Sequence, residues 1–227
     1  MSKYPIIIFE GIEASGKTTN FKIAANYLKK RRKSFIKLRE PGGSIFSEKI
    51  RKLILNKKLN LYYKTDLLLF YAGRSENFEK IIKKNYKKKI ILIDRFTDST
   101  IAYQHYGMKI DLKVIKMLNK FIIGNFNPDI VFLSTVNSKN LQKRLRNRSN
   151  LNRYDKFKLK FYNKVQNGYK KISSNNKITT LISSHLIDEM RNVTDNFLFI
   201  NKGKIIENKI LSYRQLLKNK SFKEYLK

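Results

Sequence analysis

The chain has 227 residues, 41% of them hydrophobic, which suits one large α/β domain or one domain with an appendage. The absence of cysteine excludes disulfides and thiolate metal sites, and no apolar run approaches the ~20 residues of a membrane span, so we expect a cytoplasmic protein with no membrane partner. The net charge of +33 could serve a nucleic-acid partner, but the lysines are spread along the chain beside abundant Asn and Ile, and a compositional bias explains them better.

A glycine-rich segment at residues 11–18, Gly-Ile-Glu-Ala-Ser-Gly-Lys-Thr, follows an apolar run at residues 6–9. It matches the pattern G-x-x-x-x-G-K-[ST], in which glycines let backbone N–H groups curl around phosphates, the lysine reaches the β- and γ-phosphates, and the threonine hydroxyl binds Mg²⁺. The apolar run predicts a buried strand, and the residues after the motif predict an amphipathic helix that ends near Lys33. A helix N-terminus at this point favours a phosphate site.

The next segments add a turn and two helices. Residues 34–38 predict a short strand, followed by the rigid turn Arg-Glu-Pro-Gly-Gly at 39–43, where an open parallel sheet binds ligands. A helix at 47–55 carries Arg51, which from its position alone is a solvated charge. One long helix is predicted over 64–86, with an apolar face formed by Leu67, Leu68, Phe70, Tyr71 and Ile81.

Arg74 lies one turn after Phe70 on that helix. Such a pair can stack on a nucleobase and hold its phosphate, although an aromatic at helical spacing is more often a core residue. The third strand, 89–93, ends in Asp94-Arg95, which is where Mg²⁺ or its waters are held beside a P-loop and where an arginine can bind a phosphate. The helix from residue 96 to residue 104 then begins with side chains suited to a base edge and a sugar: Asp98, Ser99, Thr100, Tyr103 and Gln104.

A fourth strand at 129–136 leads into a basic segment, residues 138–155, in which only Asp155 opposes Lys143, Arg144, Arg146, Arg148 and Arg153. An Arg-rich lid that closes over phosphates would supply charge for phosphoryl transfer. A solvated basic helix is the alternative. The alternation of strands and helices predicts an α/β P-loop NTPase fold with a parallel sheet of about five strands, helices on both faces and this lid.

Several segments resemble the thymidylate kinase family, in family order, over about residues 4–172. The combination of the Arg-Glu-Pro-Gly-Gly turn, the Asp-Arg pair and the Ala-Tyr-Gln helix start separates this family from adenylate and guanylate kinases. The matching segments are Phe9-Glu10-Gly11-Ile12-Glu13 with the P-loop, residues 39–43, Glu48-Lys49-Ile50-Arg51, Leu69-Phe70-Tyr71-Ala72-Gly73-Arg74, Asp94-Arg95-Phe96, residues 99–104 and Arg153-Tyr154-Asp155.

This resemblance implies a homodimeric dTMP kinase that transfers the γ-phosphoryl group of ATP to dTMP with Mg²⁺, giving dTDP and ADP for dTTP biosynthesis. The implied catalytic residues are Glu13, Lys17, Arg95, Arg148 and Arg153. The implied ATP-binding residues are Gly11, Ile12, Glu13, Ala14, Ser15, Gly16, Lys17, Thr18, Thr19 and Arg144. The implied dTMP-binding residues are Arg39, Arg51, Phe70, Arg74, Arg95, Ser99, Thr100, Tyr103 and Gln104. Thr18, and Asp94 through water, would hold the metal.

Two positions depart from the family pattern. Ser134 stands where an Asp is usual, and Ala14 occupies a loop position where some thymidylate kinases have an Arg. The charge that bridges donor and acceptor is therefore expected from Arg146, Arg148 and Arg153 of the lid.

The predicted kinase-like domain spans residues 1–194, with the lid at about 138–155, and residues 195–227 are expected to form an appendage with a hairpin and a basic helix. About 40 residues of this region resemble the end of an ABC-transporter ATPase domain, in which a histidine senses the γ-phosphate. The chain lacks the ABC signature segment and a preceding strand that ends in Asp-Glu, so we expect His185 to be structural or incidental.

Three other functions are alternatives to that of a dTMP kinase. A deoxynucleoside kinase has an acceptor without a phosphate, which the acceptor-side residues Arg39, Arg74 and Arg95 disfavour. A basic nucleic-acid-binding protein that retains a nucleotide site is suggested only by the charge, and an ABC-ATPase-related subunit only by the tail.

Overall fold

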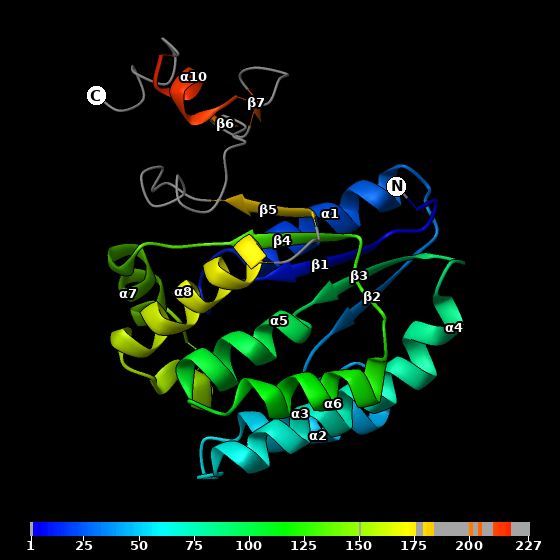
Figure 1. The fold of residues 1–227 in the computed structure, drawn as a ribbon, viewed down its shortest axis with the longest axis vertical. Helices are drawn as coiled ribbons and strands as arrows, with labels where there is room; N and C mark the ends of the chain where they lie inside the picture. The colour runs from blue at the N-terminus through cyan, green and yellow to red at the C-terminus, as the bar shows by residue number, and fades with distance from the viewer. Residues whose placement is uncertain are drawn as a thin grey trace. The chain divides into compact units, whose positions relative to one another are not determined.

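A parallel sheet of five strands, in the order β2-β3-β1-β4-β5, forms the centre of the first part of the chain (Figure 1). Phe9 of the central strand pairs with Asp94 of one neighbour and Phe132 of the other, so the P-loop begins directly beside Asp94. The predicted P-loop fold with about five parallel strands is confirmed. The strands are β1 (Ile6–Glu10), β2 (Phe35–Arg39), β3 (Ile90–Asp94), β4 (Ile130–Ser134) and β5 (Thr179–Ser183).

The structure describes residues 2–149, 151–175, 179–183, 200–201, 204–205 and 211–218. It is a computed structural model, and the chain divides into two compact units, Met1–Ser184 and His185–Lys227. The second unit contains an antiparallel pair, β6 (Ile200–Asn201) with β7 (Lys204–Ile205), and helix α10 (Tyr213–Lys218). His185 lies outside the described residues.

Helices of three kinds surround the sheet. A π-helical turn interrupts the long helix expected at 64–86, which therefore consists of three consecutive pieces. Leu68, expected on its apolar face, is 59% exposed because it lies to one side of the inward-facing Leu67, Tyr71 and Arg74. No described helix has the length and apolarity needed to cross a membrane. The elements of the first unit are α1 (Lys17–Lys30), α2 (Ile45–Leu55), α3 (Tyr63–Asn77), η1 (Phe78–Ile82), α4 (Lys83–Asn85), α5 (Thr97–Thr100), η2 (Ile101–Gly107), α6 (Leu112–Ile123), α7 (Ser138–Arg146), η3 (Arg153–Lys156) and α8 (Leu159–Asn175).

Alternate side chains of β1 enter two different cores. Ile6 and Ile8 pack in a cluster with Ile123 of α6 and side chains of η1, whereas Phe9 packs in a cluster with Ala25 of α1. This period of two is the geometry of a strand whose two faces are both covered. The covering helices fix the strands, so the loops at the carboxyl ends of the strands have a rigid base.

Candidate active site

A pocket of about 880 Å³ lies in the first unit, at the carboxyl ends of the central strands. Loops after β1, β2 and β3 contribute to it, together with α3, α5, η2, α7 and η3. The sequence-predicted residues that line it are Ile12, Glu13, Ala14, Ser15, Gly16, Lys17, Thr18, Thr19, Arg39, Arg51, Phe70, Arg74, Asp94, Arg95, Ser99, Thr100, Tyr103, Gln104, Arg144 and Arg148. Side chains that the prediction missed also line it, among them Asn20, Glu40, Leu55, Phe96, Asn152 and Tyr154.

The P-loop is held in its curled form by close backbone packing. Gly11 has a φ of 140°, and a Cβ at this position would collide with the carbonyl oxygen of Ser134, so glycine is required there. Lys17, the first residue of α1, forms an ion pair with Asp94 at the end of β3. Burial lowers the pKa of Lys17, Arg95 adds to the shift, and Asp94 opposes it.

Ser134, where the family pattern has an Asp, is buried at the end of β4 beneath the P-loop. Its hydroxyl accepts a hydrogen bond of 3.1 Å from Nδ2 of Asn20 on α1. A neutral hydrogen bond therefore joins β4 to the first turns of α1 at this position. The pair satisfies both polar side chains without adding a charge under the loop.

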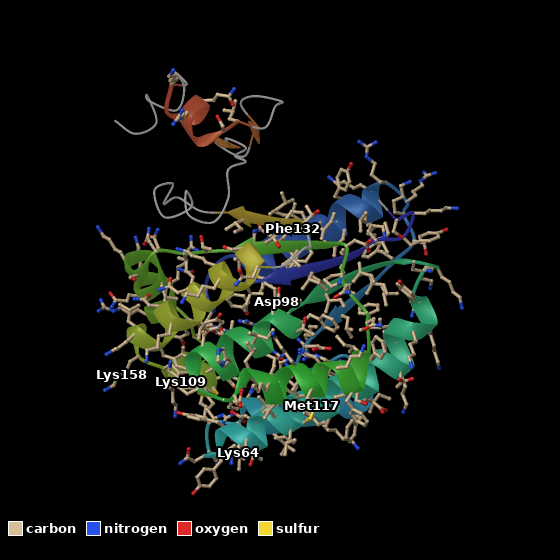
Figure 2. The ribbon with its side chains drawn as sticks, viewed as in Figure 1. Lys64, Asp98, Lys109, Met117, Phe132 and Lys158 are labelled. Carbon is tan, nitrogen blue, oxygen red and sulfur yellow. The ribbon has the colours of Figure 1, made fainter. Side chains whose placement is uncertain are left out.

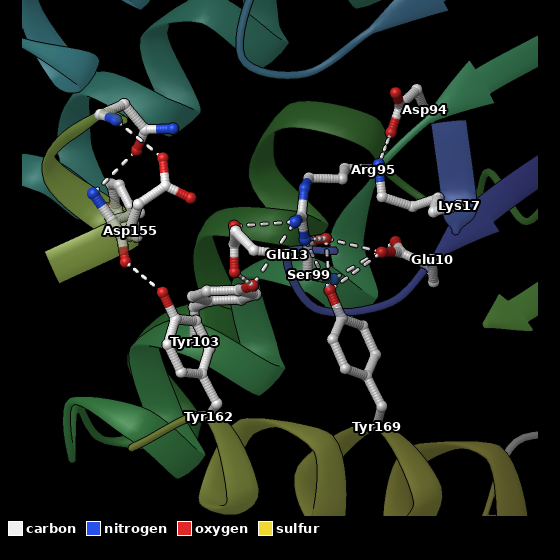
Figure 3. A network of polar contacts seen from close by, with 12 residues as sticks. Glu10, Glu13, Lys17, Asp94, Arg95, Ser99, Tyr103, Asp155, Tyr162 and Tyr169 are labelled. Carbon is white, nitrogen blue, oxygen red and sulfur yellow. Dashed lines mark hydrogen bonds and ion pairs between the residues drawn. The ribbon is translucent and has the colours of Figure 1, made fainter. Parts of the chain in front are cut away.

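The guanidinium of Arg95 is the centre of a polar network (Figure 3). Its Nη2 donates to Glu13 Oε1 at 2.9 Å and to Tyr103 Oη at 3.4 Å, and its Nη1 donates to Ser99 Oγ at 3.3 Å and to Tyr169 Oη at 3.2 Å. The Tyr103 hydroxyl in turn donates to Glu13. Arg95 has a φ of 70°, a left-handed conformation that is uncommon for a residue with a side chain and that turns it away from the line of β3.

Glu10 and Tyr169 belong to this network, although no role for either was predicted from the sequence. Glu10 is almost fully buried at the end of β1 and accepts hydrogen bonds from the backbone N–H of Phe96 at 2.8 Å and from Ser99 Oγ at 2.6 Å. A carboxylate that ends an apolar strand is a signal that could have identified Glu10. Tyr169 lies 74 residues after Arg95 in the chain. Its only sequence signal is its place on the buried face of α8 with Val165.

Aromatic rings and a buried ion pair shape the opposite end of the pocket. The ring of Phe70 meets that of Tyr154 edge-on, with centroids 6.2 Å apart. Arg74 is buried, with Nε donating to Glu40 Oε2 at 2.8 Å and Nη2 donating to Thr100 Oγ1 at 2.9 Å. Gln104 is 1% exposed, and its Nε2 donor has no hydrogen-bond partner among the described residues.

Two further arginines border the pocket from the turn after β2 and from α2. Arg39 is half exposed and paired with Glu48 Oε2 at 2.9 Å, and Arg51 donates through Nη1 to the carbonyl oxygen of Pro41 at 2.6 Å. The second contact fixes Arg51 against the turn at 39–43. The structure thus brings Arg51 to the pocket, where its position in the sequence alone favoured a solvated charge.

The lid arginines separate into two groups. Arg144 donates to the carbonyl oxygen of Ala14 in the P-loop at 2.8 Å, and Arg148 pairs with the buried Asp155. Arg153, expected to act on the phosphates, is instead paired with Asp66 of α3, and its Nε donates to the carbonyl oxygen of Ile54 at 3.0 Å.

Arg153 was expected beside the phosphates, but in the structure it lies in the ion pair with Asp66 and does not line the pocket. The Asp66 side chain is only 2% exposed and needs a cation beside it, so it holds Arg153 in this largely buried pair. Within the described part of the chain, the residues expected at the site that do not line the pocket are Gly11, Asp98, Arg146 and Arg153. Gly11 lies behind the loop, against Ser134.

Comparison with known proteins gives consistent results over most of the chain. A family model described as "Thymidylate kinase" matches residues 9–193. The chain is 38% identical over 203 residues to a thymidylate kinase of Thermosipho africanus, covering 89% of this chain and 92% of the relative, and 39% identical over 170 residues to that of Wolbachia pipientis wMel, covering 74% and 84%. A crystal structure of thymidylate kinase from Ehrlichia chaffeensis superposes with a TM-score of 0.65 at 35% identity, covering 84% of this chain and 98% of that one.

We predict that Asp98→Asn stabilises the protein at alkaline pH. Burial, with Glu10 adding to it and Arg74 opposing, raises the pKa of Asp98 to about 7 from an ordinary value of 3.8 (Figure 2 labels this residue). Between pH 3.8 and about pH 7, Asp98 loses its proton in the unfolded chain and keeps it in the folded chain. The free energy of unfolding therefore falls as pH rises through this range. Urea unfolding should show the variant more stable than wild type at pH 8, with the difference shrinking towards pH 4. A difference independent of pH would contradict this assignment.

The ion pair between Arg153 and Asp66 predicts a stability effect rather than a direct catalytic one. Arg153→Ala leaves a buried carboxylate without its cation and should lower the free energy of unfolding by about 3 kcal/mol. Arg146→Ala, on the exposed side of α7, should change it by less than about 0.5 kcal/mol. Denaturant titration measures both values, and equal stability of the two variants would refute a structural role for Arg153.

Proposed function

Because the chain belongs to the thymidylate kinase family and transfers a phosphoryl group from ATP to dTMP, we propose that the pocket binds ATP at the P-loop and dTMP between Phe70 and Arg95. Both regions line one continuous pocket, so a donor and an acceptor phosphate can meet inside it. The observation that carries this assignment is the position of Arg95, one residue after Asp94, which pairs with Lys17 of the P-loop.

The ATP phosphates are proposed to lie against the backbone N–H groups of residues 12–18. Lys17 would then exchange its partner, Asp94, for phosphate oxygens, and the N-terminus of α1 would add a favourable dipole. Arg144 and Arg148 reach the same end of the pocket from the lid and would neutralise charge as it spreads during transfer. Since Ala14 carries no charge, these lid residues supply the arginines that the loop itself lacks.

We propose that Mg²⁺ binds beside the P-loop. The hydroxyl of Thr18 and the carboxylate of Asp94 both line the pocket, and such oxygens are the ligands that Mg²⁺ prefers. Mg²⁺ usually takes only one or two protein ligands besides phosphates and water, so this small donor set fits the ion. Thr18 would bind it directly and Asp94 through water. When bound, Mg²⁺ would supply positive charge that offsets the negative charge of the phosphates during transfer.

The thymine ring is proposed to stack on Phe70. The buried Nε2 of Gln104, which lacks a partner among the described residues, supports this placement because a carbonyl oxygen of the base would satisfy it. Arg74 is proposed to act at the base edge with Thr100, to which it is already hydrogen-bonded. Tyr103 and Glu13 would face the deoxyribose, where their mutual hydrogen bond leaves little room for a 2′-hydroxyl.

Arg95 and Arg39 are proposed to hold the acceptor phosphate, with Arg51 beside them. Arg39 is half exposed and paired with a surface carboxylate, so a phosphate can replace Glu48 at small cost. Arg95 keeps its position through its own network. Phosphoryl transfer leaves little covalent work to the protein, so rate arises from alignment of the two phosphates and from the charge around them.

A homodimer is proposed through the outer faces of α2, α3 and α6, which lie together in Figure 1. Large apolar side chains are exposed on all three helices, including Leu53, Leu68, Met117 and Phe121, the last at 86% exposure (Met117 is labelled in Figure 2). Exposed apolar side chains concentrated on neighbouring elements mark interaction surfaces. Burial of these faces in a second copy would remove them from water.

We propose that residues 1–194 form the kinase domain, with a lid at about 138–155, and that residues 195–227 are an appendage, which the β6–β7 pair and α10 support. The lack of cysteine supports a cytoplasmic location.

The function is tested by an ADP-release assay with dTMP, dUMP, AMP and thymidine as acceptors, and with no acceptor. We expect the highest kcat/KM with dTMP, because Arg95 and Arg39 require a phosphate and Phe70 and Tyr103 provide aromatic rings beside the base and sugar. Turnover with thymidine above that with dTMP would contradict a monophosphate kinase. Release of ADP at the same rate without an acceptor would show a simple ATPase.

The homodimer is tested by placing a charge on the proposed interface. Phe121→Glu should convert the dimer to a monomer in sedimentation-velocity experiments, because burial of an unpaired carboxylate is costly. Ile23→Glu, on the exposed side of α1, is the matched control and should leave the dimer intact. A monomeric wild-type protein, or a dimer that persists in the Phe121 variant, would exclude this interface.

A further inference from the structure

The hydroxyl of Tyr169 contacts three polar residues of the active site, as Figure 3 shows. It lies 2.6 Å from Ser99 Oγ, 3.1 Å from Glu10 Oε2 and 3.2 Å from Arg95 Nη1. The side chain is 2% exposed, and its ring packs edge-on against that of Tyr103 with centroids 6.4 Å apart. Tyr169 does not line the pocket, so within the described residues it reaches the substrates only through others.

The direction of these hydrogen bonds follows from their chemistry. Arg95 can only donate, so the Tyr169 oxygen accepts from it, and the Tyr169 proton then goes to Glu10 or Ser99. Ser99 itself donates to Glu10. Burial, with Glu10 adding to it, raises the pKa of Tyr169 well above its usual value, so the hydroxyl keeps its proton. The carboxylate of Glu10 thus orients two neutral hydroxyls, and both oxygens face Nη1 of Arg95.

This arrangement fixes the two ends of the guanidinium from different parts of the chain. Glu13 of the P-loop holds Nη2, whereas Tyr169 of α8 and Ser99 of α5 hold Nη1. A single contact would let the planar group rotate about its own axis. Contacts at both nitrogens define its plane, which matters because a planar guanidinium binds a phosphate through two parallel hydrogen bonds.

We propose that Tyr169 is a positioning residue for the acceptor phosphate, acting by holding Nη1 of Arg95 in an orientation set by Glu10. The inference rests on the proposed binding of that phosphate by Arg95. Tyr169→Phe removes the hydroxyl and keeps the ring, so the packing against Tyr103 is retained. Ser99 remains as a donor to Glu10.

The test compares the dissociation constants of dTMP and thymidine, which differ only in the phosphate. Tyr169→Phe should weaken dTMP binding about tenfold, as expected for loss of one charge-assisted contact, and should change thymidine binding by less than about twofold. The KM for ATP should stay unchanged while kcat/KM for dTMP falls. Equal losses for dTMP and thymidine would indicate a general structural effect and would overturn the proposal, as would unchanged dTMP binding.

Tyr162→Phe is the matched control. Tyr162 lies two turns earlier on α8, is equally buried, and donates its hydroxyl proton to the carbonyl oxygen of Tyr154 at 2.7 Å instead of contacting Arg95. Loss of the Tyr162 hydroxyl should change the dissociation constants of dTMP and thymidine by the same factor. A selective effect on dTMP as large as that of Tyr169→Phe would show that the phosphate effect is not specific to Tyr169.

A double-mutant cycle with Arg95→Ala separates this inference from the function beneath it. In the Arg95→Ala background, Tyr169→Phe should have no further effect on dTMP binding, because its target is gone. If Arg95→Ala itself leaves the preference for dTMP over thymidine intact, the proposed phosphate site is wrong and the inference falls with it. If Arg95→Ala abolishes that preference but the two substitutions are additive, only the role of Tyr169 is refuted.

Discussion

The active site depends on one buried cation, the guanidinium of Arg95. A buried charge is tolerated only where partners surround it, and here a carboxylate from the P-loop, Glu13, contacts it directly, while a second, Glu10, acts through the hydroxyls of Ser99 and Tyr169. Three segments that are distant in sequence must therefore meet at one point: the end of β1 with the P-loop, the end of β3 with α5, and α8. The same meeting places the P-loop next to the residues proposed to hold the acceptor.

Helix α8 connects this centre to the lid. At one point Tyr169 contacts Glu10 and Arg95, and two turns earlier Tyr162 donates to the backbone of η3, the segment that contains Arg153. Arg153 in turn holds η3 to Asp66 on α3, the helix that carries Phe70 and Arg74. The end of the lid is thus attached to α3 and, through α8, to the network around Arg95, while Arg144 and Arg148 lie in its more exposed part and line the pocket.

The fold was predictable because its signals are local. The P-loop pattern, the apolar run at 90–93 and the alternation of strands and helices need no knowledge of distant contacts, and β3 is indeed buried on both faces. Most of the residues expected at the site also line one pocket, since they follow the ends of strands. The place of Arg153 could not be predicted because its partner, Asp66, is 87 residues away in sequence. Tyr169 was missed because only the packing of α8 brings its hydroxyl to Arg95. Contacts of this range leave no periodic trace in a sequence.

The use of acidic residues has a consequence for selectivity. The chain has only 17 acidic side chains against 50 lysines and arginines, yet Glu13, Glu40, Glu48, Asp66, Asp94 and Asp155 are all paired with a basic side chain in or next to the pocket. Most of the basic side chains that line the pocket are therefore matched by a carboxylate, and only Arg51 and Arg144 among them contact backbone carbonyl oxygens instead. A long polyanion attracted by the surface would find most of the pocket's basic side chains already paired with carboxylates. A nucleotide that fits the pocket can instead replace individual carboxylates with its phosphate oxygens. Discrimination then rests on shape and partner exchange, and the overall field contributes only to encounter.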